Sequence, residues 1–128
     1  MAVVAMLAPM GCSLGADEEP KPVSGVPKEI VVTVDDLARA IADRDYATVC
    51  DKLFTQSARE RAGGTECAAQ LRSAGEDVRH PTIEIKGIDL KRDSAAVKVI
   101  TDAAGQARVT DTLQFRREGG RWLIDALS

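Results

Sequence analysis

The spacing of apolar positions changes near the middle of the chain. Between residues 33 and 75, apolar side chains recur every three or four positions, which predicts amphipathic helices. From Pro81 onward they recur at every second position, which predicts strands with one buried face. Helices followed by an antiparallel meander predict an α+β fold, in which N-terminal helices pack on a four-stranded antiparallel sheet.

Residues that favour helix N-termini divide the helical half into segments. Thr33 is the predicted N-cap of the first helix, and Asp45 is the predicted N-cap of the second. Thr55 opens a short helical turn. Thr65 is expected to cap a last helix, which ends near Gly75.

Four strands are predicted in the second half of the chain. Their approximate ranges are 81–90, 95–102, 106–117 and 121–127. The alternation of apolar and polar residues changes phase at Gly87, so we expect a β-bulge at that position.

Two glycine-containing loops set the predicted register of the strands. Gly119-Gly120 is the centre of a two-residue hairpin loop. It places these pairs opposite each other: Phe115 with Ile124, Leu113 with Ala126, and Arg117 with Trp122. A three-residue loop over residues 103–105 then places these pairs opposite each other: Val99 with Val109, and Val97 with Asp111. A two-residue loop there would mix the apolar and polar faces of the strands.

The first residues form a separate, uncharged segment. Residues 1–11 carry no charged side chain and are too short to cross a bilayer, which takes about 20 apolar residues. Their length suits the apolar region of a signal peptide. Residues 13–29 are rich in proline, glycine and charged residues and predict a flexible linker, so a single domain is expected over residues 30–128.

Gly11-Cys12 closes that apolar segment and resembles the end of a bacterial lipoprotein signal, where small residues precede a lipidated cysteine. The resemblance implies that residues 1–12 are a signal-like segment and that Cys12 carries a lipid. It also implies an extracytoplasmic protein that is anchored to the bacterial cell membrane, because two or more acyl chains give stable anchoring. The alternative is an apolar tail with an incidental cysteine.

The other two cysteines, Cys50 and Cys67, lie on apolar faces of neighbouring predicted helices. Three cysteines are an odd number for an exported chain, and lipidation of Cys12 would leave an even pair. If the chain is exported, we expect a Cys50–Cys67 disulfide. Closing a loop of this size contributes about 3 kcal/mol in the chain-entropy model. Two buried free thiols are the alternative.

Charge and composition exclude several classes of function. The net charge is −3, and the first 27 residues hold three acidic residues and one basic residue, so the remainder carries only −1. Such a chain lacks the basic field that nucleic-acid binding needs. His80 is the only histidine, and two cysteines with one histidine do not form a convincing metal site. No phosphate loop, dinucleotide motif or nucleophile elbow occurs, so we expect no cofactor.

Two short motifs carry a resemblance to a known fold. They are the Asp43-Arg44-Asp45-Tyr46 break between helices and the closing run Gly-Gly-Arg-Trp-Leu-Ile-Asp over residues 119–125. With the helix-then-meander order, residues 30–127 resemble the nuclear-transport-factor-two-like superfamily, a cystatin-like α+β fold, and small actinobacterial lipoproteins look similar. The resemblance implies a curved sheet and a cone-like shape whose concave face lines a pocket.

The predicted register gives this pocket a carboxylate. Asp111 lies on the concave face, flanked by Val97, Val109 and Leu113. Relatives of the fold include ketosteroid isomerases and dehydratases, which use such a group as an acid or a base. The other interpretation is that Asp111 is solvated or paired with an arginine at the open end of the cone.

The sequence favours a binding protein over an enzyme, with no predicted catalytic residue. A small apolar ligand would bind in the cone, or a partner protein or second copy would dock on the outer sheet face. Three apolar residues are predicted on that face: Ile100, Leu123 and Leu127. They are either scattered surface residues or part of such a contact. The alternative is an isomerase-like or dehydratase-like activity that uses Asp111.

Overall fold

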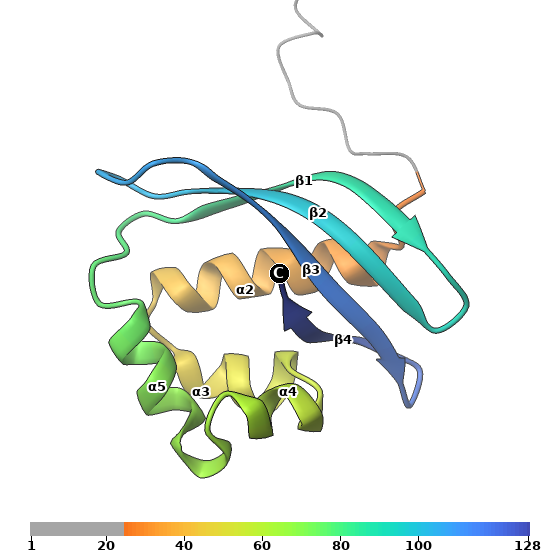
Figure 1. Cartoon of the computed structure of the whole chain (residues 1–128), viewed down its shortest axis with the longest axis horizontal. Coiled ribbons are helices and arrows are strands. Elements are labelled where there is room, and N and C mark those ends of the chain that lie inside the picture. Colours follow the sequence, from red (N-terminus) through yellow and green to blue (C-terminus); the bar gives the residue numbers. More distant parts are fainter. Residues whose placement is uncertain (1–24) are drawn as a thin grey trace, which may run out of the picture.

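The computed structural model describes residues 25–128. The predicted signal-like segment, the lipid on Cys12 and most of the predicted linker lie outside the described residues. A four-stranded sheet curves over helix α2, and the shorter helices lie on the same side of the sheet (Figure 1). The predicted α+β fold, with helices packed on a curved antiparallel sheet, is therefore confirmed.

The helical elements come first in the chain and the strands follow. The helices are α2 (Lys28–Ala42), α3 (Tyr46–Thr48), the π-helical turn η1 (Val49–Leu53), α4 (Gln56–Arg61), the 3-10 turn η2 (Gly64–Glu66) and α5 (Cys67–Ala74). The strands are β1 (Thr82–Leu90), β2 (Ser94–Asp102), β3 (Val109–Glu118) and β4 (Arg121–Leu127). They are antiparallel neighbours in the order β1-β2-β3-β4.

Helix α2 begins earlier than predicted. Pro27 is its N-cap residue, so Lys28 and Glu29 at the end of the expected linker form its first turn. Thr33 is not a cap but an interior residue, whose Oγ1 donates to the carbonyl oxygen of Glu29 at 2.9 Å. The prediction failed because Ile30 is also buried and adds a turn to the apolar stripe that faces the sheet.

The other predicted caps have mixed outcomes. Asp45 caps α3, since its side chain accepts from the backbone N–H of Thr48, and Thr55 caps α4 in the same way. Thr65 is not a cap, because it lies within η2 and Glu66 precedes α5 without a side-chain bond. Gly75 ends α5 as predicted.

The core lies between α2 and the inner face of the sheet. Its largest fully buried side chains include Ile30 and Val34 of α2, Val97 and Val99 of β2, and Phe115 of β3. These positions alternate along the strands, so one face of the sheet is apolar and the other faces solvent.

The register of the outer hairpins largely follows the prediction. The β-bulge expected at Gly87 is present, because the β1–β2 pairing shifts between Ile85 and Gly87. Phe115 pairs with Ile124 and Arg117 pairs with Trp122, as predicted. Leu113, however, pairs with Leu127 rather than with Ala126, because the β3–β4 pairing shifts at Asp125.

The predicted β2–β3 register was wrong by two residues. Val99 pairs with Asp111 and Val97 with Leu113, because the connecting loop covers residues 103–108 rather than 103–105. The longer loop contacts the segment before β1, because the backbone N–H of Ala104 donates to the backbone carbonyl oxygen of Arg79 at 2.9 Å. A shift of two residues keeps the same side chains on the inner face, so the predicted faces survive the error.

Candidate functional site

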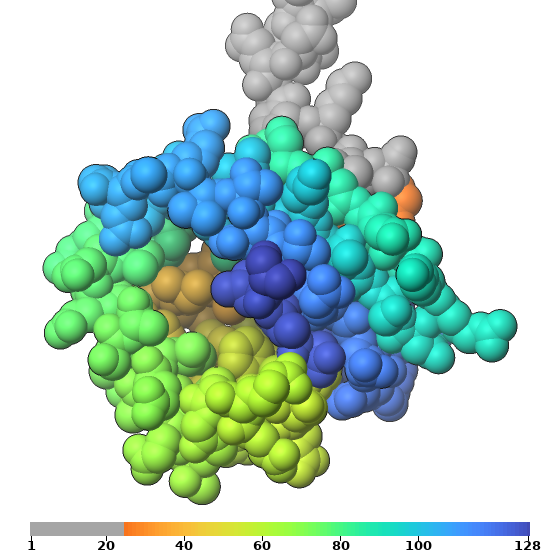
Figure 2. Space-filling view, in the orientation of Figure 1, coloured from red at the N-terminus to blue at the C-terminus, as the bar shows by residue number. Residues whose placement is uncertain are grey.

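A cavity of about 630 Å³ lies between the helices and the inner face of the sheet. In the space-filling view it is a hollow bordered by α5 and by the C-terminal end of β4, with α2 at its floor (Figure 2). The lining is mostly apolar. From the helices it includes Leu37, Ile41, Val49 and Leu71, and from the sheet Ile83, Val99, Leu113 and Ile124.

The cavity matches only part of the predicted pocket. Asp111, Val109 and Leu113 line it as expected. Val97 does not line the cavity and packs within the core instead. The two-residue register error accounts for this difference, because Val99 takes the place opposite Asp111 that was assigned to Val97.

Among residues 25–128, four charged side chains line the cavity, and three of them have partners. Asp102 forms an ion pair with Arg108, with 3.6 Å between the carboxylate oxygen and the guanidinium nitrogen. Asp125 accepts a hydrogen bond from Oγ1 of Thr55 at 2.7 Å. Arg61 donates to Oγ of Ser57 at 2.7 Å and to the backbone oxygen of Asp125.

Asp111 is the fourth charged residue of the lining and differs from the others. Among residues 25–128, no hydrogen bond or ion pair involves its carboxylate within the usual distance limits. It is half-buried on the inner face, between Val109 and Leu113 and opposite the fully buried Val99. The cavity thus combines an apolar lining with one carboxylate that the described chain leaves without a partner.

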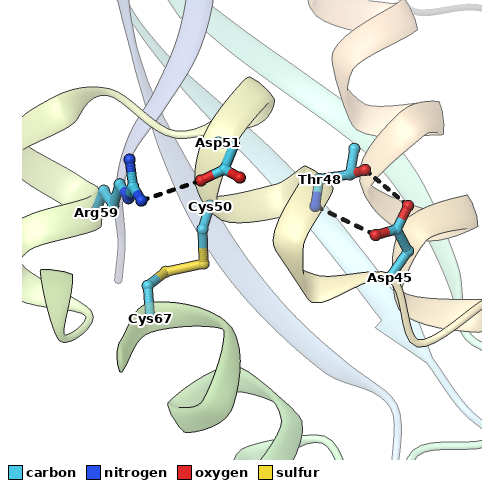
Figure 3. Close-up of a disulfide and its surroundings, with 6 residues drawn as sticks. All are labelled: Asp45, Thr48, Cys50, Asp51, Arg59 and Cys67. Atoms are coloured by element: carbon cyan, nitrogen blue, oxygen red, sulfur yellow. Dashed lines mark hydrogen bonds and ion pairs between the residues drawn. A yellow bond between two sulfur atoms is a disulfide. The ribbon is translucent and has the colours of Figure 1, made fainter. Parts of the chain in front are cut away.

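One wall of the cavity is held by the predicted disulfide. Cys50 of η1 and Cys67 of α5 are joined, with their Cα atoms 6.1 Å apart (Figure 3). Both cysteines are buried, and Leu71 and Ala74 on the same helix α5 line the cavity. Because α5 packs mainly on α3, η1 and η2, the disulfide fixes the position of this wall.

The N-cap residue of α3, Asp45, lies near the disulfide and is stabilised in its charged form. Oγ1 of Thr48 donates to Asp45 at 2.7 Å, and the backbone N–H of Thr48 donates to it at 3.3 Å (Figure 3). These bonds, the side-chain bond above all, lower the pKa of Asp45 below its ordinary value, and the nearby charge of Lys52 acts in the same direction. The cap is therefore a carboxylate over the neutral pH range.

Sequence reasoning missed the role of Arg44. This residue has φ near 58°, in the left-handed region that side chains other than glycine rarely adopt. Its guanidinium donates to three backbone carbonyl oxygens after α5: Gly75 at 3.4 Å, Glu76 at 3.2 Å and Val78 at 3.4 Å. Gly75 and Val78 line the cavity, so Arg44 braces its rim. A positive φ at an arginine leaves no sequence signal.

The three apolar residues of the predicted partner face do not lie together on the outer side of the sheet. Ile100 is on the outer face opposite Thr110, and Leu123 is opposite Arg116. Thr110 and Arg116 are separated along β3 by roughly 20 Å, so the two apolar side chains do not form one patch. Leu127 is not an outer-face residue, because the shift at Asp125 places it opposite Leu113 and beside the cavity.

Two other features bear on the site. Within residues 25–128, no three histidine, cysteine or acidic side chains are close enough together to hold a metal ion. None of the helices in this range is both long and apolar enough to cross a membrane.

Comparison with known proteins gives a fold and no family. No protein-family model matches the chain, and no curated protein matches it. A protein of unknown function from Silicibacter pomeroyi, described as nuclear-transport-factor-two-like, is similar with a TM-score of 0.60 at 19% identity, over 78% of this chain and 90% of that one. A protein of the same description from Shewanella baltica gives 0.57 at 15% identity, over 79% and 92%.

A de novo designed protein of the same fold is also similar, with a TM-score of 0.53 at 17% identity, over 83% of this chain and 87% of that one. The chain therefore has the nuclear-transport-factor-two-like fold. At these identities the likeness extends to the fold alone, since one fold hosts many activities.

Proposed function

We propose that this domain binds a small apolar ligand in the cavity between its helices and its sheet and is not an enzyme. The observation that supports the proposal is the cavity itself, whose lining is mostly apolar. Its volume of about 630 Å³ lies within the range of roughly 300–1,000 Å³ that is usual for small-molecule sites. A cavity of this size, open at one end, exposes apolar surface that a ligand would cover.

Ligand binding is a better-supported role than docking of a partner on the outer sheet face. Ile100 and Leu123 are separated on that face, whereas the apolar residues of the lining are contiguous. A catalytic role for Asp111 is the weaker alternative. No histidine and no second carboxylate without a partner line the cavity in the described part of the chain.

The proposal can be tested with N-phenyl-1-naphthylamine, a neutral dye whose emission rises in apolar surroundings. The full chain, carrying Cys12→Ser so that no lipid is attached, is titrated with the dye. We expect saturable binding that Val109→Trp weakens at least several-fold, because the larger side chain partly fills the rim. Val32→Trp is a matched control, since Val32 is 47% exposed, Val109 is 46% exposed, and Val32 lies away from this cavity.

Two results would count against the proposal. One is the absence of saturable dye binding to a folded protein. The other is equal loss of binding in both tryptophan variants, which would place the dye elsewhere on the surface.

We also propose that the domain is extracytoplasmic and is held at the bacterial cell membrane by a lipid on Cys12. The Cys50–Cys67 disulfide supports export, because disulfides persist in oxidising compartments and are rare in the cytosol. The intact mass of the protein from its host's membranes, without reducing agent, tests this proposal. A chain that begins at Cys12 and carries added acyl mass is expected, and an unlipidated chain that retains Met1 would contradict it.

A further inference from the structure

The unpartnered carboxylate of Asp111 bears on what kind of molecule the cavity takes. An ionised carboxylate is costly to remove from water unless a cation or a hydrogen-bond donor accompanies it. A purely apolar ligand that filled the cavity would cover Asp111 without supplying either. A ligand with a positively charged group would supply both.

The other charges of the lining do not offer the same opportunity. Asp102 already forms an ion pair with Arg108. Asp125 accepts a hydrogen bond from Thr55, and its other carboxylate oxygen lies 3.8 Å from Nε of Arg116. Arg61 is the cation that the described residues contribute to the lining; it is exposed and donates to Ser57 and to the backbone oxygen of Asp125. Asp111 is half-buried, so a ligand in the cavity would meet this carboxylate farther from solvent than it would meet Arg61.

The hydroxyl of Tyr46 does not offer a second contact for such a ligand. Tyr46 lines the cavity, and its hydroxyl has no hydrogen bond to any described residue. The hydroxyl oxygen has less than 1 Å² of accessible surface, however, so it is buried in the protein and not exposed to the cavity. Asp111 is half-buried, so a ligand in the cavity can reach its carboxylate.

We propose that the ligand is a cationic amphiphile, in which an apolar body fills the cavity and an ammonium-type group pairs with Asp111. This inference rests on the proposed function and narrows its ligand class. The apolar lining supplies affinity through burial, and Asp111 supplies selectivity among ligands of similar shape.

Three matched probes separate these contributions. Decylammonium, decanol and decanoate have the same chain length and carry a positive, a neutral and a negative head at pH 7. Each is used to displace N-phenyl-1-naphthylamine from the full chain. We expect decylammonium to bind about tenfold more tightly than decanol, a difference of ~1.4 kcal/mol, and decanoate to bind more weakly than decanol.

Asp111→Asn tests whether this residue is the source of the preference. The substitution keeps the shape of the side chain and removes its charge. Decylammonium and decanol should then bind within about twofold of each other. Asp89→Asn is the matched control, because it removes the same charge from an exposed residue of β1 that does not line the cavity. It should leave the tenfold preference intact.

The possible outcomes are distinguishable. If all three probes displace the dye equally well, the cavity binds apolar ligands and the inference about charge is overturned. If Asp111→Asn retains the preference, Asp111 is not its source and the inference is overturned. If none of the probes binds, the proposed function fails as well. The order of affinities of the full chain with Asp111 intact for the three probes tests the inference even if Asp111→Asn does not fold.

Discussion

The hydroxyl of Thr55 donates a hydrogen bond of 2.7 Å to Oδ1 of Asp125, which joins the start of α4 to the bulge in β4. The same hydroxyl oxygen accepts from the backbone N–H of Ala58, so it also caps α4. Thr55 is fully buried, and its own backbone N–H donates to the backbone carbonyl oxygen of Ile124 at 2.9 Å. These bonds fix one edge of the cavity, since Ala58, Ile124 and Asp125 all line it.

Replacing the hydroxyl by a methyl group should therefore destabilise the domain. In Thr55→Val, α4 loses its cap and Asp125 loses its donor, so we expect a loss of about 2 kcal/mol in the free energy of unfolding. Urea unfolding measures this change. Thr55→Ser keeps both bonds and should lose clearly less, and equal losses in the two variants would show that the hydroxyl does not matter.

Removing the disulfide should loosen the α5 wall. The double variant Cys50→Ala/Cys67→Ala should lose about 3 kcal/mol of stability, because the unfolded chain regains the freedom of the closed loop. It should also bind N-phenyl-1-naphthylamine more weakly, because Leu71 and Ala74 lie on α5. Cys12→Ala is the control and should unfold at the same urea concentration as the parent chain. A double variant with unchanged stability would contradict this account of the wall.

The Asp45 cap should make stability depend on pH in a defined direction. Its pKa in the folded state is lowered, chiefly by the hydrogen bond from the Thr48 side chain, so the unfolded state binds the proton more tightly. The contribution is therefore complete above the ordinary aspartate value of about 3.9 and is lost as the pH falls through the folded-state value.

Asp45→Asn tests that direction, because asparagine also caps helices but does not titrate. Urea unfolding at a series of pH values should show a smaller loss of stability on acidification in this variant than in the parent chain. Parallel curves for the two proteins would contradict the role assigned to Asp45.

Loss of the Arg44 side chain should loosen the rim of the cavity more than it loosens the hydrophobic core of the domain. Arg44→Ala removes three hydrogen bonds to the segment after α5 and keeps the strained positive φ. Arg44→Gly removes the same bonds but relieves the strain, so we expect it to be more stable than Arg44→Ala by about 1 kcal/mol.

Hydrogen exchange locates the effect of these variants. The amide of Val78, which donates to Gly75 at 3.1 Å, should exchange faster in both of them. Arg39→Ala removes an exposed cation that pairs with Asp36 on α2 and should leave this amide unchanged. Protection of Val78 that is unaffected by the loss of Arg44 would contradict the bracing role.

The sequence predicted the faces of the sheet better than its pairings. Alternation along β2 and β3 assigned Val99, Leu113 and Asp111 to the inner side, and this survived a register error because the error was an even number of residues. The bulge at Asp125 could not be predicted, since no glycine marks it, and it moved Leu127 from the outer face to the cavity.

The helical half shows what cap signals can and cannot predict. Asp45 and Thr55 act as caps because the chain preceding them is not helical. Thr33 has the same local signal, but the buried Ile30 before it extends the apolar stripe, so tertiary packing overrides the cap preference. The cavity itself requires three-dimensional information, because its lining comes from all four strands of the described chain and from its helices α2, α3, α4 and α5.

The central claim is that an apolar molecule occupies the space between the helices and the concave sheet. Intermolecular nuclear Overhauser effects between decanol and the methyl groups of the protein test it most directly. We predict contacts to Leu71, Val99 and Leu113, which line the cavity, and none to Val32 or Leu123, which lie outside it. Contacts to Leu123 without contacts to Leu113, or no contacts at saturating decanol, would contradict the account.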